Sequence, residues 1–335
     1  MHQIHRTYDK KFLVIQTASI GDVILSTAIG EKLFSHYPNA QIDYLVKQGN
    51  ERLFDGNPWI NEIIAWDKSK EKYKNMLRII FQLRDEKYDA VINLQRFASS
   101  GLFTLFSGAK QTFGFRKNPF SLFFSKSFEH KFKVNWHETD RNHQLIKDLT
   151  DSEKSRPALY PTMKDYAMMS PHKTKKYITI TPASLWFTKQ YPIEKWIDFI
   201  NKLDKAVLIY FLGSAADYSL CEEIISKVSR ENKMNLAGKL SFMESAALMR
   251  DASMNFVNDS AAQHIASSVN GKTTAVFCST VADFGFGPLA DDSVIIETKV
   301  ILECRPCGLH GHKKCPELHF KCALEIETNQ LLDRL

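Results

Sequence analysis

The sequence predicts an α/β protein with two similar halves, each built on a parallel sheet. Short apolar runs alternate with segments of helical periodicity in both halves, and a polar, proline-bearing segment at 151–176 separates them. At 335 residues the chain is also longer than one hydrophobic core usually serves. Strands that alternate with helices pair in parallel, and ligands bind beyond the carboxyl ends of such strands. We therefore expect two sheets that face each other across a cleft.

The first half begins with an apolar run, followed by a periodic segment that stops at Pro38 and by a second apolar run. This order predicts a buried strand, a helix and a neighbouring strand. The expected strands of this half are 12–17, 41–47, 62–67 and 88–95, and the expected helices are 22–37 and 74–87.

The second half repeats the same alternation after the polar segment, which is expected to be a linker with one short helix at most. The expected strands are 176–183, 206–215, 254–259 and 273–280, and the expected helices are 193–204, 219–232, 242–252 and 260–269.

Composition is that of a soluble globular protein, with 44% hydrophobic and 24% charged residues. No apolar run approaches the 18 or so residues that a membrane helix needs, and residues 1–11 have no leader-like apolar region. These features predict a cytoplasmic protein. The net charge of +6 suits phosphates or anionic lipids. Because no nucleic-acid-binding motif accompanies this charge, no nucleic-acid partner is expected.

Asp22 follows Gly21 at the start of the first expected helix, in a turn that lacks the glycines of a phosphate-binding loop. Two interpretations stay open. The helix dipole alone favours an aspartate in the first turn. Alternatively, Asp22 lies near an acceptor hydroxyl and acts as a general base.

The stretch 258–271 begins a helix directly after an expected strand. The free N–H groups and the dipole at a helix start suit a diphosphate. Ser260 and His264 are four residues apart and share one helix face. Asp259 would repel phosphate, so its expected partner is a sugar or ribose hydroxyl. A capped helix packed around a satisfied histidine is the structural alternative.

Two further loops follow strands of the second half. Lys189 lies in the loop after the first of these strands and is suited to neutralise a leaving phosphate, although solvated surface lysines are far commoner. Thr181 and Ser184 belong to the same loop, and Gly213-Ser214 follow the next strand.

Taken together, these blocks resemble glycosyltransferase family 9, the ADP-heptose:lipopolysaccharide heptosyltransferases. The likeness spans almost the whole chain. It rests on the Gly21-Asp22 pair and on the blocks PNAQIDYLV at 38–46, YDAVINLQ at 88–95, TPASLWFTKQYP at 181–192, FLGSAAD at 211–217 and NDSAAQHIA at 258–266.

The resemblance implies a GT-B architecture, in which two Rossmann-like domains face each other across a cleft. It implies an acceptor-binding domain at 1–160, a linker at 161–175 and a nucleotide-sugar-binding domain at 176–335. The last helix is a candidate to pack back on the first domain. The implied reaction is inverting transfer of a heptose or related sugar from an ADP-sugar donor to a lipid-linked lipopolysaccharide-core acceptor, with no cofactor required.

The resemblance also implies roles for individual residues, with Asp22 as the general base. The donor side comprises Thr181, Ser184, Lys189, Gly213, Ser214, Asp259, Ser260, Ala261 and His264, and the acceptor side comprises Ser19, Gly21, Gln95, Arg96 and Arg116. Family members commonly have glycine where Ala261 stands, which restricts how closely a donor approaches the backbone.

Two rival functions stay open. A nucleotide-sugar epimerase of GT-B fold would process its sugar nucleotide without an acceptor. A non-catalytic protein that binds nucleotide sugars or polyanions would keep the fold and lack turnover.

Four cysteines near the C-terminus have the spacing C-x2-C-x7-C-x6-C, with histidines between them. Such a set is a candidate for structural zinc. The wide second spacer favours reduced thiols or a disulfide instead. The four are Cys304, Cys307, Cys315 and Cys322.

The stretch 110–133 interleaves seven phenylalanines with six lysines and arginines. A phenylalanine-rich core with a solvated basic face is the favoured interpretation. The alternative is a surface, including Lys131 and Lys133, that contacts the inner membrane transiently on its cytoplasmic side.

Overall fold

The computed structural model describes residues 8–335, which form two compact units. One unit comprises 8–133 and 138–160, and the other comprises 134–137 and 161–335. Residues 1–7, on which the expectation of no leader largely depends, lie outside the described part of the chain. None of the described helices is long and apolar enough to cross a membrane.

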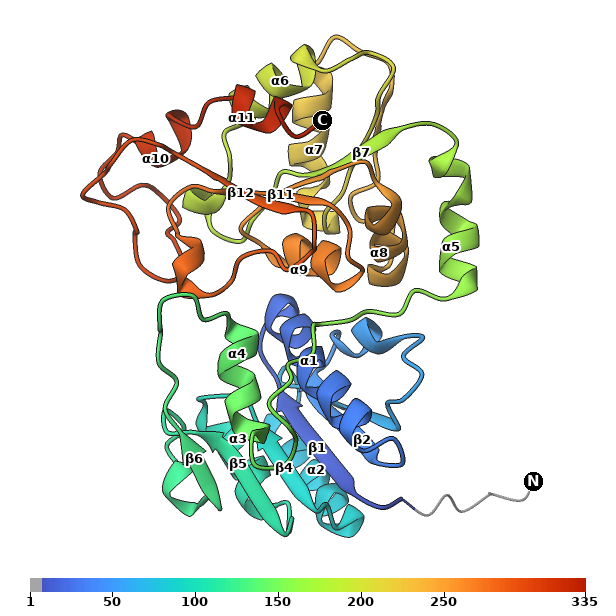
Figure 1. The fold of residues 1–335 in the computed structure, drawn as a ribbon, viewed down its shortest axis with the longest axis vertical. Coiled ribbons are helices and arrows are strands. Elements are labelled where there is room, and N and C mark those ends of the chain that lie inside the picture. The colour runs from blue at the N-terminus through green and yellow to red at the C-terminus, as the bar shows by residue number, and fades with distance from the viewer. Residues whose placement is uncertain (1–7) are drawn as a thin grey trace. The chain divides into compact units, whose positions relative to one another are not determined.

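The first unit is a six-stranded parallel sheet in the order β3-β2-β1-β4-β5-β6 (Figure 1). Helices α1 and α4 cover one face of this sheet, and α2 and α3 cover the other. Its elements are β1 (Lys11–Gln16), α1 (Ile20–His36), β2 (Gln41–Lys47), β3 (Glu62–Trp66), α2 (Lys72–Glu86), β4 (Ala90–Asn93), α3 (Ala98–Phe106), β5 (Gln111–Phe115), β6 (Lys126–Phe128) and α4 (Glu138–His143).

The second unit repeats the plan with a parallel sheet in the order β12-β11-β10-β7-β8-β9. Its strands are β7 (Tyr177–Thr181), β8 (Leu208–Phe211), β9 (Lys233–Asn235), β10 (Asn255–Asn258), β11 (Thr273–Phe277) and β12 (Ser293–Glu297). Its helices are α5 (Met163–Met169), α6 (Ile193–Lys202), α7 (Tyr218–Ser226), α8 (Phe242–Asp251), α9 (Ala261–Ser268), α10 (Lys321–Leu324) and α11 (Asn329–Leu332).

Each sheet has one point where the strand order reverses. In the first unit the chain passes from β1 to β2 on one side, and β4 pairs on the other side of β1. In the second unit β7 lies in the same way between β8 and β10. Loops diverge at such a point and leave a crevice at the carboxyl edge, where ligands bind in open α/β sheets.

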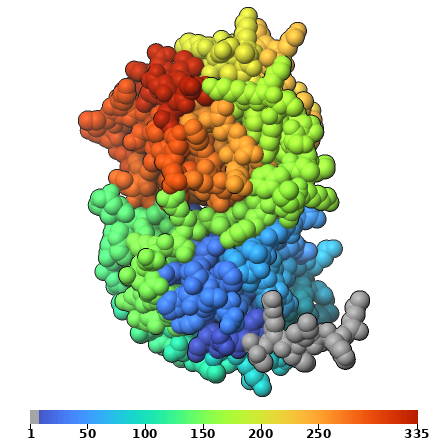
Figure 2. Space-filling model, turned by 45° about the vertical axis from the view of Figure 1, so that its right-hand side comes forward, coloured from blue at the N-terminus to red at the C-terminus, as the bar shows by residue number. Residues whose placement is uncertain are grey.

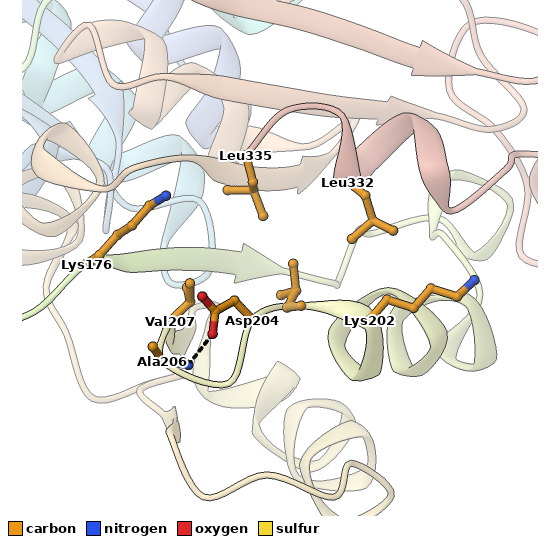
Figure 3. Close-up of a pocket in the computed structure, with 8 residues that line it drawn as sticks. Lys176, Lys202, Asp204, Ala206, Val207, Leu332 and Leu335 are labelled. Carbon is orange, nitrogen blue, oxygen red and sulfur yellow. Dashed lines mark hydrogen bonds between the residues drawn. The ribbon is translucent and has the colours of Figure 1, made fainter.

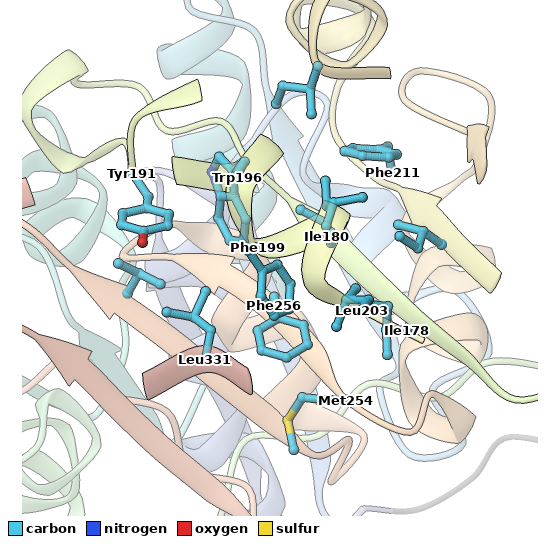
Figure 4. Packing of buried hydrophobic residues seen from close by; sticks show 14 of the residues in the cluster. Ile178, Ile180, Tyr191, Trp196, Phe199, Leu203, Phe211, Met254, Phe256 and Leu331 are labelled. Atoms are coloured by element: carbon cyan, nitrogen blue, oxygen red, sulfur yellow. The ribbon is translucent and has the colours of Figure 1, made fainter. Parts of the chain in front are cut away.

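The core of the second unit fills the layer between the sheet and helices α6, α7 and α11 (Figure 4). Trp196 on α6 is fully buried, and its ring meets the Tyr191 ring edge-on at 5.1 Å between centroids. Phe199 packs on Phe256 of β10 at 4.6 Å. Truncating an aromatic side chain in such a core costs about 3–5 kcal/mol. This layer therefore fixes the strands whose ends carry the site.

The segment expected as a linker contains α5, which begins with a capping box between Thr162 and Asp165. Helix α5 packs on α8 within the second unit, and the surface view shows the two segments side by side (Figure 2). The last helix, α11, packs on α6 of its own unit.

Four strands were not expected from the sequence, namely β5, β6, β9 and β12. Three of them, β6, β9 and β12, are edge strands, and β6 and β9 have only three residues each. The helix expected at 219–232 ends early, at Ser226. Beyond this end Arg230 folds inward and donates hydrogen bonds to the carbonyls of Ile200, in the last turn of α6, and Asp204, just after that helix.

Candidate active site

The site of the second unit lies at the carboxyl ends of β7 and β10, where its strand order reverses. Asn258, the last residue of β10, is fully buried and links the two loops. Its amide nitrogen donates to the Pro182 carbonyl at 2.6 Å, and its amide oxygen accepts from the Tyr191 backbone N–H at 3.0 Å. The loop that carries Lys189 is therefore held against the start of α9.

Lys189 and Asp259 form an ion pair at 2.7 Å, and both side chains are largely buried. The sequence placed them in one site with separate ligand contacts, and the structure brings them together. Asp259 also accepts from Thr280 Oγ1 at 2.6 Å and from Gln263 Nε2 at 3.1 Å. Ser184 donates to the Asp259 backbone carbonyl at 3.3 Å. These contacts fix the carboxylate at the head of α9.

Several polar atoms around this ion pair are buried without a hydrogen-bond partner in the described protein. They are Thr181 Oγ1, Ser260 Oγ, Gln263 Oε1 and His264 Nδ1. An unsatisfied buried polar atom costs about 1–3 kcal/mol. Such a group of atoms at one sheet edge is therefore typical of a site that a polar ligand completes.

His264 faces this region from the second turn of α9 and is only 5% exposed. Burial, with smaller contributions from His137 and Lys189, lowers its pKa to about 3. The imidazole is therefore neutral at physiological pH and acts as a hydrogen-bonding group. Ser260 is the N-cap residue of α9 and Ala261 is its first residue, so the backbone N–H groups of the helix start there.

Gly213 and Ser214 have a structural role at the same carboxyl edge of the second sheet. Ser214 donates through its backbone N–H and its hydroxyl to the Asp217 carboxylate, at 2.8 and 2.7 Å. A Cβ atom at Gly213 would lie 2.9 Å from the Asp217 Cβ. The pair therefore terminates β8 and begins the next helical turn, on the other side of β7 from Asp259.

The loop that contains His312 contacts the Lys189 loop, a contact that the sequence analysis did not predict. Thr188 donates its backbone N–H to the His312 carbonyl at 3.1 Å, and the His312 N–H donates to Thr188 Oγ1 at 2.7 Å. Ser279 also donates to Thr188 Oγ1, at 3.0 Å. The only sequence feature that could have indicated this contact is the presence of glycines and histidines between the cysteines of the loop.

The cysteines of that loop do not form a recognisable metal centre. Among residues 8–335, no group of three or more histidine, cysteine or acidic side chains is arranged to hold a metal ion. The zinc interpretation is therefore unsupported. The six described cysteines are free thiols, and Cys304 Sγ lies 3.8 Å from His319 Nε2.

In the first unit, the turn after β1 carries Ser19, Gly21 and Asp22 at the point where the strand order reverses. Ser19 is the N-cap residue of α1 and donates its hydroxyl to Asp22 Oδ2 at 2.5 Å. Asp22 is half-buried in the first turn of the helix. Its position fits both interpretations of this residue, because a helix start favours a carboxylate whatever its chemical role.

Gln95 lies beside this turn, at the end of the neighbouring strand. Its side-chain N–H donates to the side-chain oxygen of Gln16, the last residue of β1. Asn118 donates to the Gln95 carbonyl at 3.1 Å. The structure therefore brings Gln95 to the Ser19–Asp22 turn.

Arg96 and Arg116 follow β4 and β5 at the same edge but lie on the surface. Arg96 stacks over the Phe97 ring at 5.4 Å, and Arg116 pairs with Glu129 at 3.3 Å. In the 110–133 stretch, Phe113, Phe115 and Phe124 are buried. This burial agrees with the core interpretation for these three residues.

A pocket of about 630 Å³ that the sequence did not indicate lies beyond the ends of β2 and β3. Lys47, Lys68 and Lys70 line it, together with Asp67. Burial and the charges of Lys47 and Lys72 lower the pKa of Lys68. Three lysines around one opening suit an anionic ligand.

A second pocket, of about 380 Å³, lies at the opposite edge of the second sheet (Figure 3). Lys176 immediately precedes β7, and Ala206 and Val207 precede β8. The chain end, including Leu335, closes its other side. Because it is at the amino ends of the strands, it is separate from the Lys189–Asp259 site.

Comparison with known proteins agrees with this arrangement. Residues 76–319 match the profile of glycosyltransferase family 9 (heptosyltransferase). Lipopolysaccharide heptosyltransferase 3 of Escherichia coli K12 is 27% identical over 282 residues, which cover 78% of this chain and 80% of that protein.

Solved structures are similar over nearly the whole chain. E. coli ADP-heptose LPS heptosyltransferase II has a TM-score of 0.81 at 20% identity and 97% coverage of both chains. E. coli heptosyltransferase WaaC, solved with ADP, has a TM-score of 0.74 at 16% identity, with 96% of this chain and 98% of that chain covered. This likeness confirms the expected fold of two Rossmann-like units of the GT-B type.

Proposed function

Because the chain belongs to glycosyltransferase family 9, the heptosyltransferase family, we propose that it transfers a heptose from ADP-heptose to a lipopolysaccharide inner-core acceptor. The observation that carries the donor assignment is the group of unsatisfied polar atoms around Lys189 and Asp259, at the start of α9. The names of the similar proteins support the sugar and the acceptor, and the ADP complex of WaaC supports the nucleotide.

We assign the two sides of the reaction to the two units. Residues 1–160 provide the acceptor side, and residues 176–335 bind the nucleotide sugar. The protein works in the cytoplasm and meets the inner-membrane surface transiently, because its acceptor is lipid-linked. The lysine pocket at Lys47, Lys68 and Lys70 is suited to an anionic group of that acceptor.

In the proposed mechanism, Asp22 accepts the proton of the acceptor hydroxyl as this oxygen attacks the anomeric carbon of the heptose. The bond between that carbon and the diphosphate oxygen breaks, and ADP leaves with the bonding electrons. Attack on the face opposite the leaving group inverts the configuration. The Ser19 hydroxyl holds the Asp22 carboxylate in place through its 2.5 Å hydrogen bond.

The leaving diphosphate needs positive charge and N–H donors. Lys189 and the backbone N–H groups at Ser260 and Ala261 provide them in this proposal. Lys189 is already held by Asp259, so it is oriented before the donor binds. His264, neutral in its buried position, and Ser260 offer hydrogen bonds to the donor.

A nucleotide screen tests the donor class. ADP is expected to raise the melting temperature of the protein more than UDP or GDP does. Lys189→Ala should weaken ADP binding about tenfold or more, because a charge-assisted contact contributes about 1.5–3 kcal/mol. Lys202→Ala is the matched control, since Lys202 pairs with Asp198 on the surface at the opposite sheet edge. Equal affinity of wild type and Lys189→Ala for ADP contradicts the role of Lys189.

A further inference from the structure

Helix α2 of the first unit exposes an apolar stripe on its outer face. Tyr73, Leu77 and Phe81 are 70%, 54% and 66% exposed. Residues four apart on a helix lie on one face, so these three form a continuous line about two turns long. The core does not use these three side chains, because the inner face of α2 fills it with Met76, Ile79, Ile80 and Leu83.

The stripe is bordered by cations. Lys74 and Arg78 lie along one side of it and Arg84 is beside its end, by helical position. Lys72 lies 5.5 Å from the Tyr73 ring centre. Lys74 forms an ion pair with Glu71 at 3.2 Å, whereas Arg78 and Arg84 form none within residues 8–335.

The start of α2 continues into the lysine pocket. Lys70 lines that pocket and is two residues before Lys72, the first residue of the helix. The cationic surface thus runs from the carboxyl ends of β2 and β3 along the apolar stripe. A bilayer carrying anionic head groups complements both parts, because apolar side chains enter the head-group region while lysines and arginines meet phosphates.

We propose that the outer face of α2, centred on Tyr73, Leu77 and Phe81, docks on the surface of an anionic phospholipid bilayer. This inference extends the proposed function, since a lipid-linked acceptor lies in such a surface. Docking at α2 brings the Lys68–Lys70 end of the pocket to the head-group region, where an anionic part of the acceptor is found.

A rival apolar surface exists in the same unit. Leu122 and Phe123 are 91% and 68% exposed. Three cations of this stretch are engaged with acidic side chains, because Glu129 pairs with both Arg116 and Lys131, and Asp148 pairs with Lys126. The α2 face therefore complements anionic lipid better.

Vesicle co-sedimentation of the full chain tests the proposal. Wild type is expected to bind phosphatidylethanolamine–phosphatidylglycerol vesicles more strongly than phosphatidylcholine vesicles, and less strongly as salt rises. Leu77→Ser with Phe81→Ser should reduce this binding about tenfold or more, because two apolar side chains no longer enter the bilayer. Arg78→Glu should reduce it severalfold. Melting temperatures close to that of wild type exclude unfolding as the cause.

The matched control is Leu122→Ser with Phe123→Ser, which removes the rival surface and should leave binding unchanged. Loss of binding in this control, with binding retained by the α2 variant, overturns the proposal. Absence of wild-type binding to anionic vesicles also overturns it, as does equal binding to phosphatidylcholine.

Turnover separates this inference from the proposed function. With a delipidated, water-soluble acceptor, the α2 variant should keep wild-type activity, because no catalytic residue has changed. If no ADP-heptose is consumed with any acceptor, the proposed function is wrong while the vesicle result still decides the docking surface. If the α2 variant loses activity on the delipidated acceptor, α2 acts in catalysis or acceptor binding and the docking proposal is wrong.

Discussion

Asp22 occupies a position where a structural role and a catalytic role look alike. It is the third residue of α1 after the N-cap Ser19, and the Ser19 hydroxyl donates to it at 2.5 Å. Asp165 has the same place in α5, where the Thr162 hydroxyl donates to it at 2.6 Å. What distinguishes Asp22 is its strand: β1 ends where the sheet order reverses, whereas α5 follows a connecting segment.

We predict that Asp22→Asn lowers kcat by about 10²–10⁴-fold, because an amide cannot accept the acceptor proton. The affinity for ADP should not change, since the proposed nucleotide contacts all belong to the second unit. Asparagine has nearly the same shape and still accepts the Ser19 hydrogen bond. Steady-state transfer rates and ADP titration measure the two effects.

Asp165→Asn is the control for this variant, because it makes the same chemical change at the same helical position. It should leave kcat unchanged. A similar kcat for Asp22→Asn and wild type would remove Asp22 from the mechanism. Loss of ADP affinity together with kcat would instead indicate a wider structural effect.

The sequence predicted the location of single residues where chemistry and strand position coincide. Lys189, Asp259 and His264 were each expected after a strand, and the structure brings all three to one edge. The ion pair between Lys189 and Asp259 was not predicted, because it joins loops 70 residues apart and depends on Asn258 holding them together. Neither spacing nor periodicity encodes such a contact.

At the scale of elements, the loop at 304–319 acts as a support for the Lys189 loop. Gly311 lies against Thr188 and Lys189: a Cβ atom there would be 2.9 Å from Thr188 Oγ1 and 3.1 Å from Lys189 Cγ. Its φ of +74° is in the left-handed region, which favours glycine. Both the close contact with Thr188 and the left-handed backbone therefore require glycine at position 311.

We predict that Gly311→Ala weakens ADP binding severalfold and lowers the free energy of unfolding by about 1–2 kcal/mol. The loss of binding follows because Thr188 must move, and Lys189 moves with it. Calorimetric titration with ADP measures the first effect and denaturant unfolding the second.

Gly308→Ala separates the two effects. Gly308 is in the same loop with the same φ of +74°, but no atom lies within 4 Å of its would-be Cβ. Gly308→Ala should therefore lower the free energy of unfolding through backbone strain and leave the affinity for ADP unchanged. Equal loss of affinity in both variants would show that the contact with Thr188 is not what orients Lys189.

Sequence reasoning identified the central strands of both sheets and missed several edge strands. Central strands such as β1 and β4 are buried on both faces and consist mainly of consecutive apolar residues. Edge strands such as β6 and β9 are short and carry polar residues, so their pairing is decided by the neighbouring strand. The cationic pocket was missed for a similar reason, because Lys47 and Lys68 become neighbours only when β2 pairs with β3.

At the scale of the whole molecule, the chain leaves the first unit for the last time at Tyr160 and continues in the second from Pro161. The Tyr160 hydroxyl donates to the Glu31 carboxyl oxygens at 2.8 and 2.9 Å, and the Trp59 indole N–H lies 3.4 Å from the same hydroxyl. Helix α1, which carries Asp22 in its first turn, thus anchors the connection to the second unit through Glu31. The same helix carries the proposed base at one end and the anchor near the other.

Burial raises the pKa of Glu31 from 4.5 to about 7. Folding therefore favours the protonated carboxyl. This stabilisation is fully present below pH 4.5, declines as the pH rises towards 7 and is absent above it. Partial solvent access limits the effect to about 2 kcal/mol.

We predict that Glu31→Gln removes this part of the pH dependence, because the glutamine amide is always neutral and its oxygen still accepts the Tyr160 hydrogen bond. The free energy of unfolding of the variant, compared with wild type, should rise from about zero at pH 4.5 to about 2 kcal/mol at pH 8. Urea unfolding followed by tryptophan fluorescence measures this difference at each pH.

Subtracting the wild-type free energy of unfolding removes the contributions of Asp43 and Glu62, whose pKa values burial also raises. Glu153→Gln, an exposed change in the same unit, is the control for replacing one glutamate by glutamine. A pH-independent difference for Glu31→Gln would mean that Glu31 is ionised in the folded protein, and that the anchor at Tyr160 is a charged hydrogen bond.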